Sequence, residues 1–205
     1  MYSTDDTIVA IATPAGRGGI GVVRISGPSA AEVASGLLTL DAPLQPRHAT
    51  FARTHGDQVV ATSFPAPHSY TGEHVVELSA HGSPVVLRQI VEQAMALGAR
   101  LAEPGEFTLR AFLNNRIDLV QAEAVADLID AVTPLQARAA FDQLEGTLTE
   151  RIAAIDAELF DLTAKLEASL DFPDEGYHFV EAGEDRKSTR LNSSHQSVSR
   201  MPSSA

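Results

Sequence analysis

The sequence contains no cysteine, and aromatic residues make up only 5% of its 205 residues. The absence of cysteine excludes disulfide bonds, thiolate metal sites and a cysteine nucleophile in this chain. Its uninterrupted apolar runs are far shorter than the ~20 residues that a membrane-spanning helix needs. Asp5 and Asp6 stand where a secretory signal would carry Lys or Arg. We therefore expect a cytoplasmic protein that does not bind membranes.

Basic residues are scarce as well, and they are unevenly distributed. The formal net charge is −12, and residues 119–184 hold 15 acidic side chains against 3 basic ones. Residues 1–118 are closer to neutral, with 11 acidic and 8 basic side chains. Because contacts to phosphate require Lys and Arg, the acidic segment argues against broad nucleic-acid binding by this part of the chain. A well-solvated helical face accounts for the acidic residues.

The stretch "GRGGIGVVRIS" (Gly16–Ser26) contains the pattern G-x-G-x-x-G, which is typical of dinucleotide-binding loops. In such loops the last glycine opens a helix, and the helix N-terminus binds the phosphates. Here Gly21 is followed by a β-branched run, and residues 7–13 before the loop are strand-like too. We therefore predict two strands joined by a loop whose glycines permit positive φ or close backbone approach.

Alternating strand and helix patterns continue to about residue 118. Helices are predicted from Ser26, as N-cap with Pro28 in the first turn, and between Ser83-Pro84 and Gly98. Gly56-Asp57 predicts a tight turn between two strands. The full set of expected strands is 7–13, 20–25, 48–55, 58–64 and 74–79. This mixture indicates an α+β or α/β domain.

After Asp118 the pattern becomes helical throughout. Residues 119–132 predict one helix, and Thr133-Pro134 reads as the cap and first turn of the next. Apolar residues then recur at steps of three and four, which predicts one seam of a helix of more than 30 residues, with a possible kink at Gly146. The seam comprises Leu144, Leu148, Ile152, Ile155, Leu159, Leu162 and Leu166. Such an apolar stripe needs another helix to cover it.

The last segment, residues 185–205, is rich in serine and reverses the charge trend. Asp185–His195 can be read codon for codon as the in-frame translation of a widely used sequencing-library adapter. We therefore expect a non-native tail and a natural protein that continues past Glu184. A natural disordered tail is the alternative that the composition also allows.

Four stretches carry a family resemblance: "TPAGRGGIGVVRISG", "FPAPHSYTGEHVVELSAHG", "EPGEFTLRAFLNNRIDLVQAEAVADLIDA" and "DFPDE". In this order they resemble the N-terminal part of the MnmE (TrmE) family of tRNA modification GTPases, from residue 5 to about residue 180. The resemblance implies that residues 1–118 form an α+β domain with a fold similar to that of the glycine cleavage T-protein. This domain would bind folate and form the dimer. Residues 119–184 would form the first part of an all-α helical domain, within which the family's GTPase domain is inserted after "DFPDE".

The resemblance also implies an activity for the family as a whole. Its members form a 5-carboxymethylaminomethyl-type group at the wobble uridine of tRNA, together with the flavin-dependent partner MnmG. The cofactors are 5-formyl-tetrahydrofolate or 5,10-methylene-tetrahydrofolate, with GTP, Mg and K in the GTPase domain. No G-x-x-x-x-G-K-[ST] loop and no cysteine motif occur in this sequence. We therefore expect this chain neither to bind GTP nor to complete the reaction.

The family's folate contacts fall on Arg24, Glu77 and Arg116. A carboxylate such as Glu77 can accept hydrogen bonds from adjacent N–H groups of a pterin edge. Guanidinium groups pair well with the carboxylates of the folate tail, although the sequence does not assign Arg24 or Arg116 to either end of the ligand. The family usually has Lys where this chain has Arg116, and "GHGG" where it has "AHGS", so Ser83 changes the loop after the strand.

Simpler interpretations stand beside these. Arg24 could be an exposed arginine or part of a structural ion pair, and Glu77 could face solvent on its strand. His74, Glu77 and His81 suggest a metal site, but positions 74 and 77 of a strand point to opposite faces. The alternative functions are a dimerisation module without folate binding and a freestanding one-carbon folate protein.

Overall fold

A computed structural model of the chain describes residues 5–171, with the side chains of Ser169 and Asp171 excluded. The chain divides into two compact units, and the boundary in the sequence falls between Gly146 and Thr147. The "DFPDE" motif after Asp171, the position Glu184 and the tail 185–205 lie outside the described residues. The predictions made for them stay predictions.

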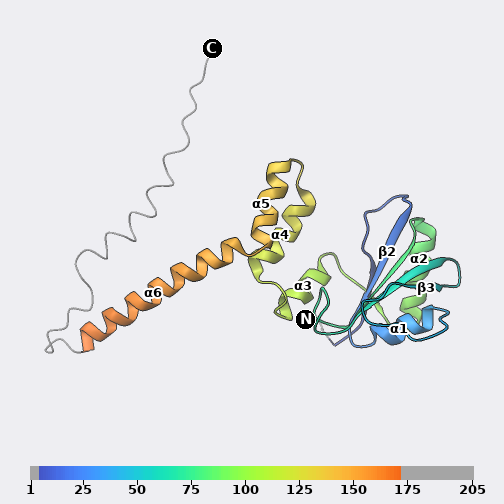
Figure 1. The fold of residues 1–205 in the computed structure, drawn as a ribbon, viewed down its shortest axis with the longest axis horizontal. Coiled ribbons are helices and arrows are strands. Elements are labelled where there is room, and N and C mark those ends of the chain that lie inside the picture. Colours follow the sequence, from blue (N-terminus) through green and yellow to red (C-terminus); the bar gives the residue numbers. More distant parts are fainter. Residues whose placement is uncertain (1–4, 172–205) are drawn as a thin grey trace, which may run out of the picture. The chain divides into compact units, whose positions relative to one another are not determined.

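The first unit is built on one mixed sheet (Figure 1). The order of its strands is β3-β4-β5-β2-β1-β6. All neighbouring strands are antiparallel except β1 and β6, which run parallel. Each of the five predicted strands is present, whereas β6 was not anticipated. The strands are β1 (Ile8–Ile11), β2 (Ile20–Ser26), β3 (Thr50–Arg53), β4 (Gln58–Phe64), β5 (Val75–His81) and β6 (Arg100–Leu101).

Helices α1 (Ala30–Leu37) and α2 (Pro84–Ala96) pack against one face of this sheet. Val23 and Ile25 of β2 and Leu78 of β5 are fully buried in the core that the helices share with the sheet. Because side chains alternate along a strand, Arg24 and Glu77 lie on the opposite face and are only half-buried. The core therefore takes one side of each central strand and leaves the other side available for a site.

The start of α1 differs from the prediction. Ser26 is the last residue of β2, and the N-cap position belongs to Ser29. The Ser26 hydroxyl is buried and lies 2.7 Å from both Thr71 Oγ1 and Glu73 Oε2. Gly27, at φ 135°, turns the chain between the strand and the helix. Helix α2 begins as predicted, with Ser83 at the N-cap and Pro84 in the first turn.

Three further helices complete the first unit: α3 (Glu106–Leu113), α4 (Leu119–Asp130) and α5 (Pro134–Leu144). Helix α3 was not anticipated. Helix α4 begins with a capping box between Asp118 and Gln121, and α5 begins with one between Thr133 and Gln136. Thr133 and Pro134 therefore form the predicted cap and first turn, which satisfies backbone N–H groups that the helix itself cannot pair.

The second unit contains α6 (Thr147–Asp171), a helix of 25 residues. The prediction of one continuous helix of more than 30 residues is wrong, because Gly146 adopts a left-handed conformation, at φ 88°, and separates α5 from α6. The predicted seam survives on α6, where Ile152, Ile155 and Leu159 are each at least half exposed. Between residues 5 and 171, no helix is long and apolar enough to cross a membrane.

Candidate functional site

The glycine-rich loop connects β1 to β2 in an antiparallel pair and does not open a helix. Gly21 lies on the core side of β2, where an added Cβ would come within 2.4 Å of Leu87 Cδ1. The N–H of Gly18 donates to the carbonyl of Gly82 at 3.0 Å, and a Cβ on Gly82 would lie 2.5 Å from the carbonyl oxygen of Gly18. The prediction of a strand pair with close backbone contacts is therefore confirmed.

Arg24 and Glu77 form the centre of the candidate site. They are direct partners on β2 and β5, and both Nε and Nη2 of Arg24 lie 2.8 Å from Glu77 Oε1. The two side chains are 24% and 29% exposed, so the pair is accessible from solvent. The structure thus brings together two of the three predicted folate contacts, and it does so as an ion pair.

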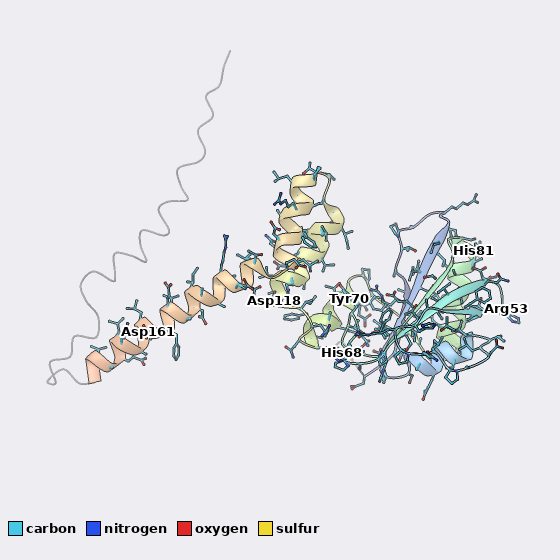
Figure 2. All side chains as sticks on the ribbon, in the orientation of Figure 1. Arg53, His68, Tyr70, His81, Asp118 and Asp161 are labelled. Carbon is cyan, nitrogen blue, oxygen red and sulfur yellow. The ribbon has the colours of Figure 1, made fainter. Side chains whose placement is uncertain are left out.

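Two aromatic rings lie against the Arg24 guanidinium. Its central carbon is 5.0 Å from the ring centroid of Tyr70 and 5.5 Å from that of Phe107, which are distances typical of cation–π contacts. Tyr70, labelled in Figure 2, belongs to the loop between β4 and β5. Phe107 belongs to the first turn of α3. The hydroxyls of Tyr70 and Thr108 are hydrogen-bonded at 2.9 Å. Two segments that are distant in the sequence therefore line the site.

Arg116 lies just beyond α3, and its side chain is exposed. Its N–H donates to the carbonyl of Ala111 at 2.8 Å, and its Cγ would be 3.1 Å from a Cβ placed on Gly72. Arg116 therefore packs against the same loop that carries Tyr70. It also lines an open pocket of about 430 Å³, together with Phe112, Leu113, Asn115, Ile117, Asp118 and Gln121. Among the hydrogen bonds and ion pairs of residues 5–171, none joins Arg116 to Arg24 or Glu77.

A buried ionic cluster around Arg110 was not anticipated from the sequence. The Arg110 side chain is 1% exposed, and it donates to Glu73 Oε1 at 3.1 Å and to Glu106 Oε1 at 3.1 Å. It also binds the Asp6 carboxylate and, at 2.8 Å, the Asp6 carbonyl. One signal could have indicated part of it, since Glu106 and Arg110 are four residues apart, the spacing of a helical ion pair.

Arg100 extends this cluster to β6. It donates to Asp6 Oδ2 at 2.7 Å and to Glu106 Oε1 at 2.6 Å. These hydrogen bonds are the main reason that the pKa values of the Asp6 and Glu106 carboxyl groups lie below their ordinary values. Burial opposes the charge on Arg110, but hydrogen bonds to Asp6 and the nearby Glu73 carboxylate outweigh it and raise the pKa of Arg110.

His74 and His81, two of the metal ligands that the sequence suggested, have other partners. His81 Nδ1 lies 2.7 Å from Asp57 Oδ1, and His74 Nδ1 accepts from the N–H of Ala66 at 3.3 Å. Asp57 belongs to the predicted turn between β3 and β4, where Thr54 N–H donates to its carbonyl at 2.9 Å. Within residues 5–171, no three His, Asp or Glu side chains are grouped so that they could hold a metal ion.

Comparison with known proteins matches two parts of the chain to two different family models. Residues 7–116 match the family "GTP-binding protein TrmE N-terminus", and residues 119–205 match "MnmE helical domain". Both the mixed sheet with its helices and these matches confirm the predicted α+β class followed by an all-α part.

Curated relatives with the name "tRNA modification GTPase MnmE" are about half identical to this chain. The protein of Legionella pneumophila (strain Corby) is 50% identical over 184 residues, covering 87% of this chain and 41% of the relative. That of Koribacter versatilis is 52% identical over 190 residues, with 88% and 42% covered. That of Burkholderia cenocepacia is 50% identical over 201 residues, with 91% and 43% covered. The chain thus spans about two fifths of its relatives' length, and it belongs to the MnmE (TrmE) family of tRNA modification GTPases.

Proposed function

We propose that this chain acts in tRNA modification and that its first unit binds a reduced folate carrying a one-carbon unit. Arg24, Glu77 and Arg116 would be the binding residues. The observation that carries the proposal is the half-buried Arg24–Glu77 pair, placed on the side of β2 and β5 opposite α1 and α2 and beside two aromatic rings. A charged pair next to flat apolar surface suits a ligand that is aromatic at one end and anionic at the other.

The available hydrogen-bonding groups fit such a ligand. Both contacts from Arg24 go to Glu77 Oε1, so within the described residues Glu77 Oε2 has no hydrogen-bond donor. A carboxylate oxygen in this position can accept from the N–H groups of a pterin edge. The exposed guanidinium of Arg116 would serve the carboxylates of the folate tail, because guanidinium groups bind carboxylates through paired N–H donors. The bound folate would supply the one-carbon unit.

Other parts of the proposal concern the whole protein. We infer that the substrate is the wobble uridine of tRNA, with MnmG as the partner and with GTP, Mg and K bound elsewhere in the full-length family. The proposed homodimer has support on the sheet face that carries Arg24. There Phe51 and Val60 are cross-strand neighbours and are 62% and 41% exposed. Exposed apolar side chains paired in this way are typical of contact surfaces.

Calorimetric titration of 5-formyl-tetrahydrofolate into the 205-residue chain tests the folate proposal. We expect saturable binding that weakens at least about tenfold in Glu77→Gln, since a hydrogen bond to a charged group is lost from the ligand. Glu92→Gln is the matched control, because Glu92 is exposed on α2, which packs on the other face of the sheet. Absence of saturable binding, or equal affinity in the two variants, would overturn the proposal.

The dimerisation module without folate affinity is the second candidate, and the exposed Phe51–Val60 pair favours it. It predicts a dimer by light scattering that dissociates in Phe51→Glu, combined with no heat of folate binding. A freestanding one-carbon folate protein has no such support, because residues 119–205 match the family's helical domain.

A further inference from the structure

Arg110 connects the two segments that bring aromatic rings to Arg24. Glu73 stands three residues after Tyr70, and Glu106 immediately precedes Phe107. The Arg110 guanidinium lies within hydrogen-bonding distance of both carboxylates, at 3.1 Å in each case. One buried side chain therefore fixes the end of the β4–β5 loop and the start of α3 relative to each other.

Further contacts join the same two segments. The Tyr70 and Thr108 hydroxyls are 2.9 Å apart, and Asn114 Nδ2 donates to the carbonyl of Thr71 at 2.7 Å. The loop is also held to the sheet, because Ser26 Oγ donates to Glu73 Oε2 at 2.7 Å. Tyr70 and Phe107 thus belong to two segments that several hydrogen bonds hold together, with the buried Arg110 among the contacts.

We propose that Arg110 is a positioning residue for the folate site: it holds Tyr70 and Phe107 against Arg24 through Glu73 and Glu106. This inference rests on the proposed function. Arg24 is bound on one side by Glu77, and the two rings limit where its guanidinium can move. Arg24 and the Glu77 carboxylate are thereby fixed before a ligand arrives, which avoids the entropic cost of ordering them on binding.

The role differs from simple stabilisation because the effect is transmitted to one tyrosine ring. The chain has three tyrosines, Tyr2, Tyr70 and Tyr177. In a Tyr2→Phe/Tyr177→Phe background, 3-fluorotyrosine labelling gives a single ¹⁹F resonance that reports on Tyr70. Arg110→Lys keeps the charge but loses the forked geometry, and Glu73→Gln keeps the shape of the side chain but removes its charge. Glu92→Gln on α2 is the control for charge loss.

The experiment measures the ¹⁹F spectrum and the affinity for 5-formyl-tetrahydrofolate well below the Tm of each variant. We expect the Tyr70 resonance to shift or broaden in Glu73→Gln and in Arg110→Lys, and the Kd to rise about tenfold, as for the loss of one strong hydrogen bond. If Arg110→Lys does not fold, Glu73→Gln decides, because Asp6 and Glu106 still pair with Arg110 in that variant.

A lowered Tm with an unchanged resonance and unchanged Kd would assign Arg110 a purely structural role and overturn the inference. If the parent chain binds no folate, the proposed function fails, and the spectrum alone then tests the positioning. A perturbed Tyr70 resonance upholds it, whereas a resonance identical to that of Glu92→Gln overturns it.

Discussion

Gly21 and Leu87 are packed so closely that no side chain fits between them. A Cβ on Gly21 would lie 2.4 Å from Leu87 Cδ1 and 2.9 Å from Cδ2. The glycine that completes the apparent nucleotide-binding pattern is therefore required by the packing of α2 against β2. Gly19 lies in the glycine-rich loop just before β2, and an added Cβ there would meet no atom within 4 Å.

Gly21→Ala should destabilise the chain by about 1–3 kcal/mol, the range for overpacking of a core. Gly19→Ala is the control and should change the free energy of unfolding by less than about 0.5 kcal/mol. Urea unfolding measures both. In a Leu87→Ala background the clash disappears, so Gly21→Ala should then have little further effect. An equal cost in the two backgrounds would contradict the packing explanation.

Replacement of Arg110 by Met should destabilise the chain by about 3–5 kcal/mol, because it leaves buried carboxylates without their cation. Glu106 is 2% exposed and Glu73 is 12% exposed, so water cannot fully replace the guanidinium. Arg88→Met is the matched control, since Arg88 is exposed on α2. Urea unfolding should show a change below about 0.5 kcal/mol for it. Similar losses in both variants would show that the cluster contributes no specific stability.

The cluster also predicts how stability depends on pH. Hydrogen bonds from Arg100 hold the pKa of Asp6 below 3.8 and that of Glu106 below 4.5 in the folded chain. The unfolded chain therefore binds more protons in acid, and this stabilisation is present in full above the ordinary pKa values. It is lost as the pH falls through the lower folded values.

Urea midpoints measured from pH 7 down to pH 3 should stay level at first and then fall below about pH 4.5. Glu106→Gln removes one of the responsible groups, so its acid slope should be shallower than that of the parent. Parallel slopes in the two proteins would contradict the assignment to Glu106.

Helix α6 predicts association of the chain beyond the proposed dimer. Its seam includes Ile155 and Leu159, which are 59% and 53% exposed. An apolar stripe of this kind gains free energy when it is covered. Light scattering should report a mass above that of a dimer, and Ile155→Gln combined with Leu159→Gln should lower it. Glu158→Gln is the control on the same helix. A dimer mass for the parent chain would count against this prediction.

Local patterns were sufficient for much of the fold. The alternation in residues 58–64 predicted β4 with its observed bounds, and Thr133-Pro134 marked the start of α5. Strand alternation and helix caps are set by residues close together in the sequence, so the sequence alone can reveal them. The start of α1 was wrong because Ser26 and Ser29 are both acceptable caps, and only the contacts of Ser26 with Thr71 and Glu73 decide between them. At Gly146 the sequence pattern allowed a kink within one helix, whereas the left-handed backbone of Gly146 ends α5 and separates it from α6.

The candidate site depends on contacts between distant residues. Arg24 and Glu77 are 53 residues apart, and their pairing follows from the register of β2 and β5. The family resemblance named both as folate contacts, but no pattern in the sequence predicted that register. Arg110 reaches Asp6 across 104 residues, and no local pattern places these two together. Phe107 belongs to a helix that the sequence analysis did not identify, so the second ring beside Arg24 was missed.

The location of bound folate tests the account most directly. Backbone amide shifts of the isotope-labelled chain, followed by NMR during titration with 5-formyl-tetrahydrofolate, map the residues that the ligand affects. We predict that the largest changes fall on β2 around Arg24, on β5 around Glu77, on the loop with Tyr70 and on the residues around Arg116. Changes confined to other surfaces, or no changes at saturating ligand, would contradict a folate site at the Arg24–Glu77 pair.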